Sequence, residues 1–170
     1  MVAQNKVVIL FFCIVLILSV KPVFGLDKST KLIGSNTLNN LGLDGIGNTI
    51  CLIDSGVDYT HENLGDCSTI FNCGKILGGY DFHNGDNDPI DLTGHGTEVA
   101  GIIISSHSKF RGVAPGAKLT AVRALGNGGN WVSLNKSVAW CVNNRNVYNI
   151  TIVSMSLGDS NPHTSTSCND

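Results

Sequence analysis

The chain has 170 residues, which is enough for one domain of ordinary size. Apolar residues make up 42% and charged residues only 14%, so a core can be buried and overall disorder is not expected. The formal net charge is −2 and no Lys/Arg cluster occurs, so nothing indicates a nucleic-acid partner.

Residues 1–25 are predicted to be a secretory signal peptide and not part of the fold. Lys6 precedes an apolar run, Val7–Val20, and Val23–Gly25 offers residues small enough for cleavage. The run is shorter than the about 20 residues of a membrane span, and an uncleaved anchor is the less favoured alternative. We therefore expect a secreted, extracellular protein that has no membrane partner once the signal is removed.

The first predicted core element is a strand over Ile50–Ile53. It follows a polar, glycine-dotted entry segment, residues 26–47, in which a short helix is predicted near Thr37–Leu41. The apolar, β-rich run is typical of a buried strand, and Asp54-Ser55-Gly56 is typical of the turn that ends it. Open α/β sheets place their ligands at the carboxyl ends of central strands, so Asp54 is a candidate site residue.

A second strand is predicted over Lys75–Tyr80, and an acidic loop follows it. The loop, residues 81–91, contains four aspartates. Oxygen ligands at this density suit calcium, although their spacing differs from that of an EF-hand loop and a solvated loop fits equally well. The sequence thus predicts no required cofactor, leaves calcium as an open alternative and assigns no metal-binding residue.

The segment Asp91–Ser105 carries the strongest chemical signal. His95 lies between Gly94 and Gly96 and opens an apolar run typical of a buried helix. An imidazole in the first turn of such a helix is anchored by the core and open at its tip, which suits a general base. Taken alone, the motif is equally consistent with a glycine-rich helix entry and a solvated histidine. Gly101, inside this helix, is predicted to mark close packing against the sheet.

Four motifs together resemble the subtilisin-like serine protease family. In family order they are Asp-Ser-Gly-Val-Asp (54–58), Gly-His-Gly-Thr-Glu-Val-Ala-Gly (94–101), Gly-Val-Ala-Pro-Gly-Ala (112–117) and Ser-Met-Ser-Leu-Gly (154–158). The resemblance covers roughly residues 31–159, and it implies that residues 26–170 form a partial subtilisin-like peptidase domain. It also implies a catalytic role for Asp54, which would fix the tautomer of the imidazole, and for His95, which would take the proton of a serine.

Strands and helices alternate in the rest of the chain. Strands are predicted over Lys118–Ala124 and Asn149–Met155, with a helix over Trp131–Asn144 between them. The apolar stripe of this helix is predicted to face the core and comprises Trp131, Leu134, Val138 and Val142. The alternation and the resemblance predict an α/β fold of the subtilisin-like three-layer type: a parallel sheet with helices on both faces, truncated at its C-terminal side.

The resemblance implies two substrate-binding segments and therefore protein or peptide substrates. Gly126 and Gly128 lie in a glycine-rich stretch that resembles the edge along which the family's substrates lie as an added strand. Ser156, Leu157 and Gly158 resemble the opposite wall of the cleft. A flexible loop that opens a helix is the alternative for the two glycines.

Five cysteines remain when Cys13 of the signal segment is set aside. Cys67 and Cys73 bracket a turn-like stretch and are predicted to form a disulfide, because export implies an oxidising compartment. Cys51 and Cys141 are interpreted as buried thiols, with their pairing and that of Cys168 left open. The odd count leaves one partner unaccounted for, which is a first indication of an incomplete chain.

The 170 residues lack the family's nucleophile segment, Gly-Thr-Ser-Met-Ala. Ser165 and Ser167 lie in a tail without the strand–turn–helix context that the nucleophile needs. Two hypotheses follow: the N-terminal portion of a secreted serine endopeptidase, inactive by itself, or a non-catalytic secreted remnant that binds extended peptides. The presence of both Asp54 and His95 favours the first hypothesis, because a binding module has no need of them.

Overall fold

The computed structural model describes residues 25–126 and 131–158, and the predicted signal segment lies outside these ranges. The elements in chain order are α2 (Leu26–Leu32), α3 (Ser35–Asn40), β1 (Thr49–Asp54), the 3-10 helix η1 (Ile70–Asn72), β2 (Ile76–Asp81), α4 (His95–Ile104), β3 (Lys118–Arg123), α5 (Trp131–Asn143), α6 (Arg145–Tyr148) and β4 (Ile150–Met155).

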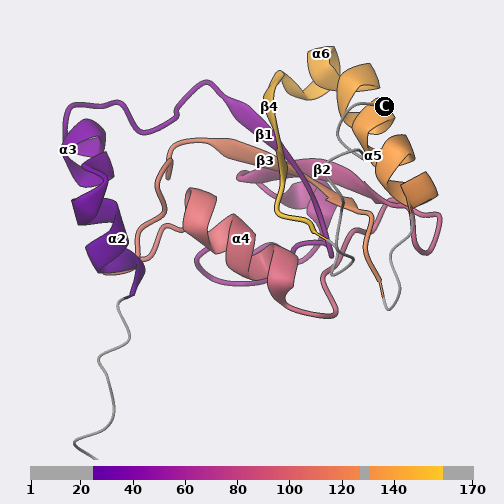
Figure 1. The fold of residues 1–170 in the computed structure, drawn as a ribbon, viewed down its shortest axis with the longest axis horizontal. Coiled ribbons are helices and arrows are strands. Elements are labelled where there is room, and N and C mark those ends of the chain that lie inside the picture. Colours follow the sequence, from indigo (N-terminus) through magenta and orange to yellow (C-terminus); the bar gives the residue numbers. More distant parts are fainter. Residues whose placement is uncertain (1–24, 127–130, 159–170) are drawn as a thin grey trace, which may run out of the picture.

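The four strands form one parallel sheet in the order β2-β3-β1-β4 (Figure 1). β1 lies between β3 and β4, and all six of its residues are buried. Its largely apolar sequence, TICLID, suits a strand that is covered on both faces. The predicted α/β fold with a parallel sheet is confirmed, and each predicted strand differs from the observed one by about a residue at either end.

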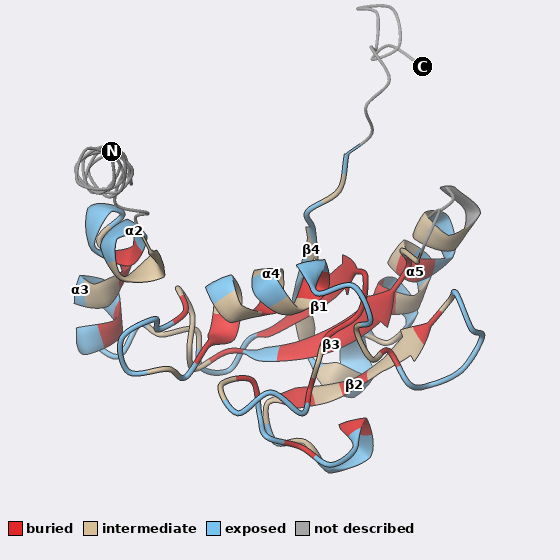
Figure 2. Ribbon diagram, turned by 90° about the horizontal axis from the view of Figure 1, so that it is seen from below, coloured by how far each residue is buried: buried red, intermediate tan, exposed pale blue. Residues whose placement is uncertain are grey.

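The helices cover the sheet from two sides. On one side, Ala100 and Ile104 of α4 join Leu52 of β1 in the larger core cluster. On the other side, α5 contributes to a smaller cluster around Ile53 and Val122. Figure 2 shows the buried residues concentrated in the strands between these helices. Side chains alternate along each strand, so the two clusters are the two faces of one sheet and the predicted three-layer arrangement is confirmed.

A disulfide joins Cys51 of β1 to Cys141 of α5, so the interpretation of these two cysteines as buried thiols is wrong. Cys51 faces the α5 side of the sheet, and the Cα atoms are 6.0 Å apart, a separation that suits a disulfide. The bond ties the second layer to the central strand. Cys67 and Cys73 form the other disulfide, as predicted, and Cys168 lies outside the described residues.

Two predictions about helix packing are also wrong. Gly101 does not approach the sheet, because a methyl group there would meet nothing within 4 Å; it lines a surface pocket instead. Val142 of α5 is exposed, whereas Leu134, Val138 and Cys141 pack against the sheet. The stripe of α5 therefore runs through Cys141, and the side chain of Trp131 lies outside the described residues.

Helices α2 and α3 stand to one side of the sheet, in indigo in Figure 1. α3 lies where a short helix was predicted, but α2 was missed because its sequence, LDKSTKL, is mostly polar. Leu32 and Ile33 near its end are exposed. Within the described ranges, no helix is both long and apolar enough to cross a membrane.

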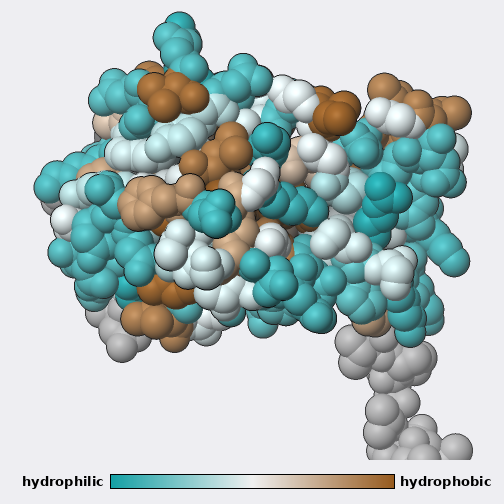
Figure 3. Space-filling model, turned by 180° about the vertical axis from the view of Figure 1, so that it is seen from behind, coloured by the Kyte–Doolittle hydropathy of each residue, from teal (hydrophilic) through white to brown (hydrophobic). Residues whose placement is uncertain are grey.

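β4 forms one edge of the sheet, and its large apolar side chains are partly uncovered. Ile152 and Met155 are 52% and 49% exposed. On the opposite face from the view of Figure 1, hydrophobic groups likewise lie at several separate places among hydrophilic ones (Figure 3). Apolar surface is thus exposed along β4.

Candidate active site

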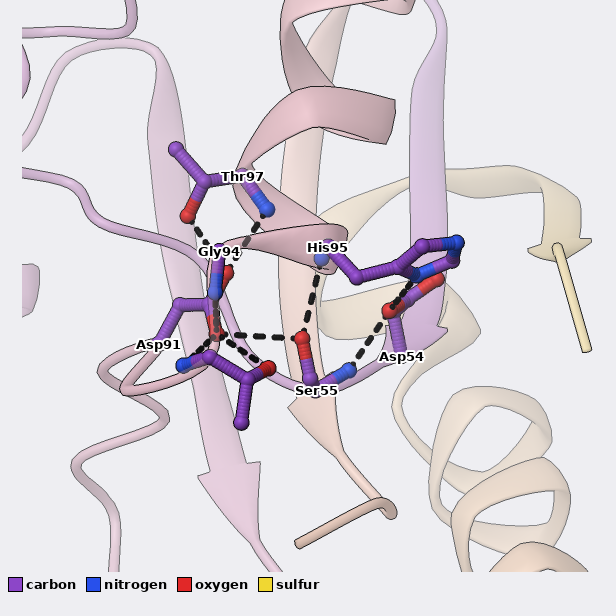
Figure 4. Close-up of polar contacts among 8 residues, drawn as sticks. Asp54, Ser55, Asp91, Gly94, His95 and Thr97 are labelled. Atoms are coloured by element: carbon purple, nitrogen blue, oxygen red, sulfur yellow. Dashed lines mark hydrogen bonds and ion pairs between the residues drawn. The ribbon is translucent and has the colours of Figure 1, made fainter.

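Asp54 and His95 meet at the carboxyl edge of the sheet. Asp54 is the last residue of β1, and His95 is the first residue of α4, which packs on that strand. The Nδ1 atom of His95 lies 2.7 Å from Oδ1 of Asp54 (Figure 4). The distance falls within the roughly 2.6–3.2 Å expected of an acid–base pair, so the contact that the resemblance implies is present.

Glycines on either side of His95 make this approach sterically feasible. Gly94 has φ 98° and ψ −24°, a left-handed conformation that costs glycine little. A methyl group on Gly96 would collide with the carbonyl oxygen of Gly56 and lie 3.1 Å from Cβ of Asp54. The start of α4 can therefore lie directly on the end of β1 only because residue 96 has no side chain.

The surroundings of the pair fix the role of each ring nitrogen. Asp54 is fully buried, and its Oδ1 also accepts a hydrogen bond of 2.7 Å from the backbone N–H of Ser55. Since the carboxylate accepts from Nδ1, this nitrogen carries the proton in the neutral imidazole. The His95 side chain is 54% exposed, and no described residue bonds to Nε2, so this atom is free to accept a proton.

The pKa of His95 is raised above its ordinary value. The hydrogen bond to Asp54 is the largest cause, followed by the negative charge of the same carboxylate. Partial burial lowers the pKa, while the charges of Glu98 and Asp91 raise it further. The protonated imidazole is thus stabilised at this place, as required of a base that must hold a proton during a reaction.

A second carboxylate, Asp91, organises the same region, and its role was not predicted. Its Oδ2 accepts from the backbone N–H and the hydroxyl of Thr97 at 2.9 and 2.6 Å. Its Oδ1 accepts from the N–H groups of Thr93 and Gly94 and, at 3.0 Å, from the hydroxyl of Ser55 (Figure 4). Burial raises the pKa of Asp91, but the hydrogen bonds from Thr97, Thr93 and Gly94 outweigh it and lower the pKa to about 2. An aspartate shortly before a glycine-rich helix start is a capping signal that could have revealed this role.

The predicted substrate segments flank Asp54. Gly126 follows β3, and the N–H groups of Ala124 and Leu125 donate to the carbonyl oxygen of Asp54. Ser156, Leu157 and Gly158 directly follow β4, the other neighbour of β1. Gly128 lies outside the described residues. The described parts of both segments thus leave the sheet at the edge where Asp54 lies.

The four aspartates of the loop 81–91 bond to protein groups. Asp81 pairs with Arg123 at 2.8 Å, and Asp88 accepts from the hydroxyl of Tyr59. Asp86 accepts from the backbone N–H of Asp88, and Asp91 accepts from the backbone N–H of Thr97 in the first turn of α4. In the described part of the chain, no three His, Cys, Asp or Glu side chains are grouped so as to hold a metal ion. Calcium binding stays the open alternative that the sequence leaves.

A buried carboxylate that orients an exposed imidazole is the arrangement that the Asp–His portion of a hydrolase triad requires. Comparison with known proteins defines the family. The profile of the Subtilase family (Peptidase_S8) matches residues 45–170, and the chain belongs to this family.

Three similar proteins show the extent of the match. The thermophilic serine proteinase of Bacillus sp. (strain AK1) is 44% identical over 87 residues, which are 49% of this chain and 20% of that protein. The minor extracellular protease Vpr of Bacillus subtilis (strain 168) is 38% identical over 119 residues, 65% of this chain and 14% of Vpr. The solved structure of the Clostridium perfringens CspB protease matches with a TM-score of 0.59 and 27% identity, covering 74% of this chain and 32% of that one. The chain therefore spans less than half the length of each of these proteins.

Proposed function

We propose that this chain supplies the Asp–His part of the active site of a secreted serine endopeptidase. The observation that carries the proposal is the 2.7 Å contact between Asp54 and Nδ1 of His95, with Nε2 left open. In the proposed reaction, Nε2 takes the proton of a serine hydroxyl as the oxygen attacks a peptide carbonyl. Asp54 stabilises the imidazolium that forms, and His95 then gives the proton to the leaving amine.

The serine itself has no family-type segment in these 170 residues. We therefore propose that the 170-residue chain does not turn over peptides by itself. Without the nucleophile, acyl transfer has no first step, whatever the basicity of His95. The Asp–His pair is present, but the proposed reaction also needs a serine that these 170 residues do not supply in a family-type segment.

The proposed substrates are extended polypeptides. Gly126 and the segment 156–158 leave the sheet on the two sides of Asp54, which supports a cleft that runs past His95. A peptide that pairs with the backbone of either segment gains affinity independently of its side chains. This mode of binding suits an endopeptidase, which must hold residues on both sides of the cleaved bond.

Secretion is proposed on three grounds. The leader pattern of residues 1–25 has the order of a signal peptide. The two disulfides of the described residues suit an oxidising compartment. One similar protein, Vpr, is described as an extracellular protease.

The test begins with the nucleotide sequence beyond codon 170. A downstream Gly-Thr-Ser-Met-Ala segment would allow the extended protein to be expressed and assayed with a fluorogenic peptide and a serine-directed phosphonate probe. We expect His95→Ala to abolish turnover and His61→Ala, an exposed histidine outside the site, to leave it unchanged. The 170-residue chain should neither turn over nor react with the probe. Stoichiometric labelling of Ser165 or Ser167 together with turnover would contradict the proposal, and peptide binding without turnover in the extended protein would support the remnant hypothesis.

A further inference from the structure

We propose that Asp91 is a positioning residue that acts through the hydroxyl of Ser55 to hold the Asp54 carboxylate and the start of α4 in the register that pairs Asp54 with His95. The proposal rests on the proposed function, because the pair matters only if it does acid–base chemistry. The geometry itself is measurable without turnover.

Ser55 bonds to Asp54 and to Gly96, the residue that follows His95. Its backbone N–H donates to Oδ1 of Asp54 at 2.7 Å, and its hydroxyl oxygen accepts from the N–H of Gly96 at 2.9 Å. Gly96 directly follows His95, so one residue binds the end of β1 to the first turn of α4. Ser55 is buried, which strengthens these bonds because water does not compete for them.

Asp91 determines the direction of the Ser55 hydroxyl. The hydroxyl has a single proton, and this proton is donated to Oδ1 of Asp91 at 3.0 Å. The oxygen lone pairs of Ser55 are then directed away from Asp91 and toward the N–H of Gly96. In the absence of the Asp91 acceptor, the hydroxyl is free to rotate and the contact with Gly96 is no longer fixed.

The same carboxylate also fixes the helix directly. Its two oxygens accept six hydrogen bonds: from the hydroxyl of Ser55, from the N–H and hydroxyl groups of Thr93 and Thr97, and from the N–H of Gly94. Every partner is a donor, so an amide cannot replace the carboxylate without directing its own N–H groups at a donor. Asp91→Asn therefore breaks the arrangement although it preserves shape.

The experiment is an NMR titration of His95 in the purified chain. Three carboxylates influence its pKa, namely Asp54, Glu98 and Asp91, so a loss of the Asp91 charge would lower the pKa even without movement. Ser55→Ala separates the two effects because it removes the hydroxyl and no charge. Asp91→Glu does so independently, since it keeps the charge and displaces the carboxylate by one methylene.

We expect Ser55→Ala, Asp91→Asn and Asp91→Glu each to raise the acid dissociation constant of His95 about threefold or more and to weaken the low-field Nδ1 proton signal. Asp88→Asn is the matched control: it neutralises a carboxylate of the same loop that bonds to Tyr59, and it should leave His95 unchanged. Ser55→Thr keeps the hydroxyl and should preserve the wild-type titration. Labelling of His95 by diethylpyrocarbonate, mapped by mass, gives a second measurement at low protein concentration.

An unchanged His95 titration in Ser55→Ala would overturn the proposal. If that variant does not fold, an unchanged titration in Asp91→Glu overturns it instead. If the His95 titration shifts as expected in every variant but the extended protein is inactive, the positioning role is supported and the proposed function is contradicted. The two failures are therefore distinguishable.

Discussion

β1 and β4 are neighbours in the sheet, have the same length and carry similarly apolar sequences, yet their burial is opposite. All six residues of β1 are buried, whereas β4 is intermediate or exposed along its whole length. β1 has a strand on each side, a helix on each face and a disulfide to α5. Among the described strands, β4 pairs with β1 alone. The number of covering neighbours thus decides burial here, and the hydrophobicity of the strand does not.

The largest effect expected from this comparison concerns the two disulfides. Cys51–Cys141 closes a loop of 90 residues around the central strand, and Cys67–Cys73 closes one of 6. By reducing the entropy of the unfolded chain, the disulfide is expected to stabilise the fold by about 4.6 kcal/mol for the long loop and about 2 kcal/mol for the short one. Urea unfolding of Cys51→Ala/Cys141→Ala and of Cys67→Ala/Cys73→Ala should show the larger loss in the first variant. Equal losses in the free energy of unfolding would mean that the disulfide to β1 stabilises the fold no more than the short one does.

A matched pair of isoleucines tests the comparison on the strands themselves. Ile53 of β1 is 0% exposed, and Ile152 of β4 is 52% exposed. Ile53→Ala should cost about 2–5 kcal/mol, because it removes buried surface and leaves a cavity. Ile152→Ala should cost about 1 kcal/mol or less, because half of the side chain is already in contact with solvent. Denaturant midpoints at constant m-value provide the measurement. A cost for Ile152→Ala comparable to that of Ile53→Ala would show that β4 is covered in solution.

The smallest change in stability is expected from a substitution on the outer surface of α4. Gly101 has open space around the position of a Cβ atom, so alanine fits there and favours the helix by up to about 1 kcal/mol. Thermal unfolding of Gly101→Ala should therefore show a small rise in melting temperature. A fall would mean that another part of the protein packs against this position.

Much of this arrangement could be predicted from the sequence. The strands were found because apolar β-branched runs end at turn residues, and the Asp54–His95 pair was found because two motifs occur in family order. The Cys51–Cys141 disulfide could not be predicted, since it depends on which face of β1 Cys51 occupies and how α5 docks 90 residues later. The Asp91 network was missed for a related reason: a count of aspartates in a loop does not show which donors each carboxylate meets.

The error at Gly101 has a physical cause as well. A glycine within a helix signals either close packing or an absence of contacts, and the sequence alone does not separate the two. The structure assigns close packing to Gly96 instead, one turn earlier, where the helix begins on the end of β1.

The central claim is that Asp54 orients the imidazole of His95 and raises its pKa, so that it can act as a general base. The most direct test is the pKa of His95 with and without that carboxylate. NMR titration of the wild-type chain should give a His95 pKa above the ordinary value of about 6.5, and Asp54→Asn should lower it. The upward shift of the His95 pKa also affects stability. Protonated His95 stabilises the folded state at low pH, and this contribution is lost as the pH rises through the raised pKa. A wild-type His95 that titrates at or below the ordinary value, with no change in Asp54→Asn, would contradict the account.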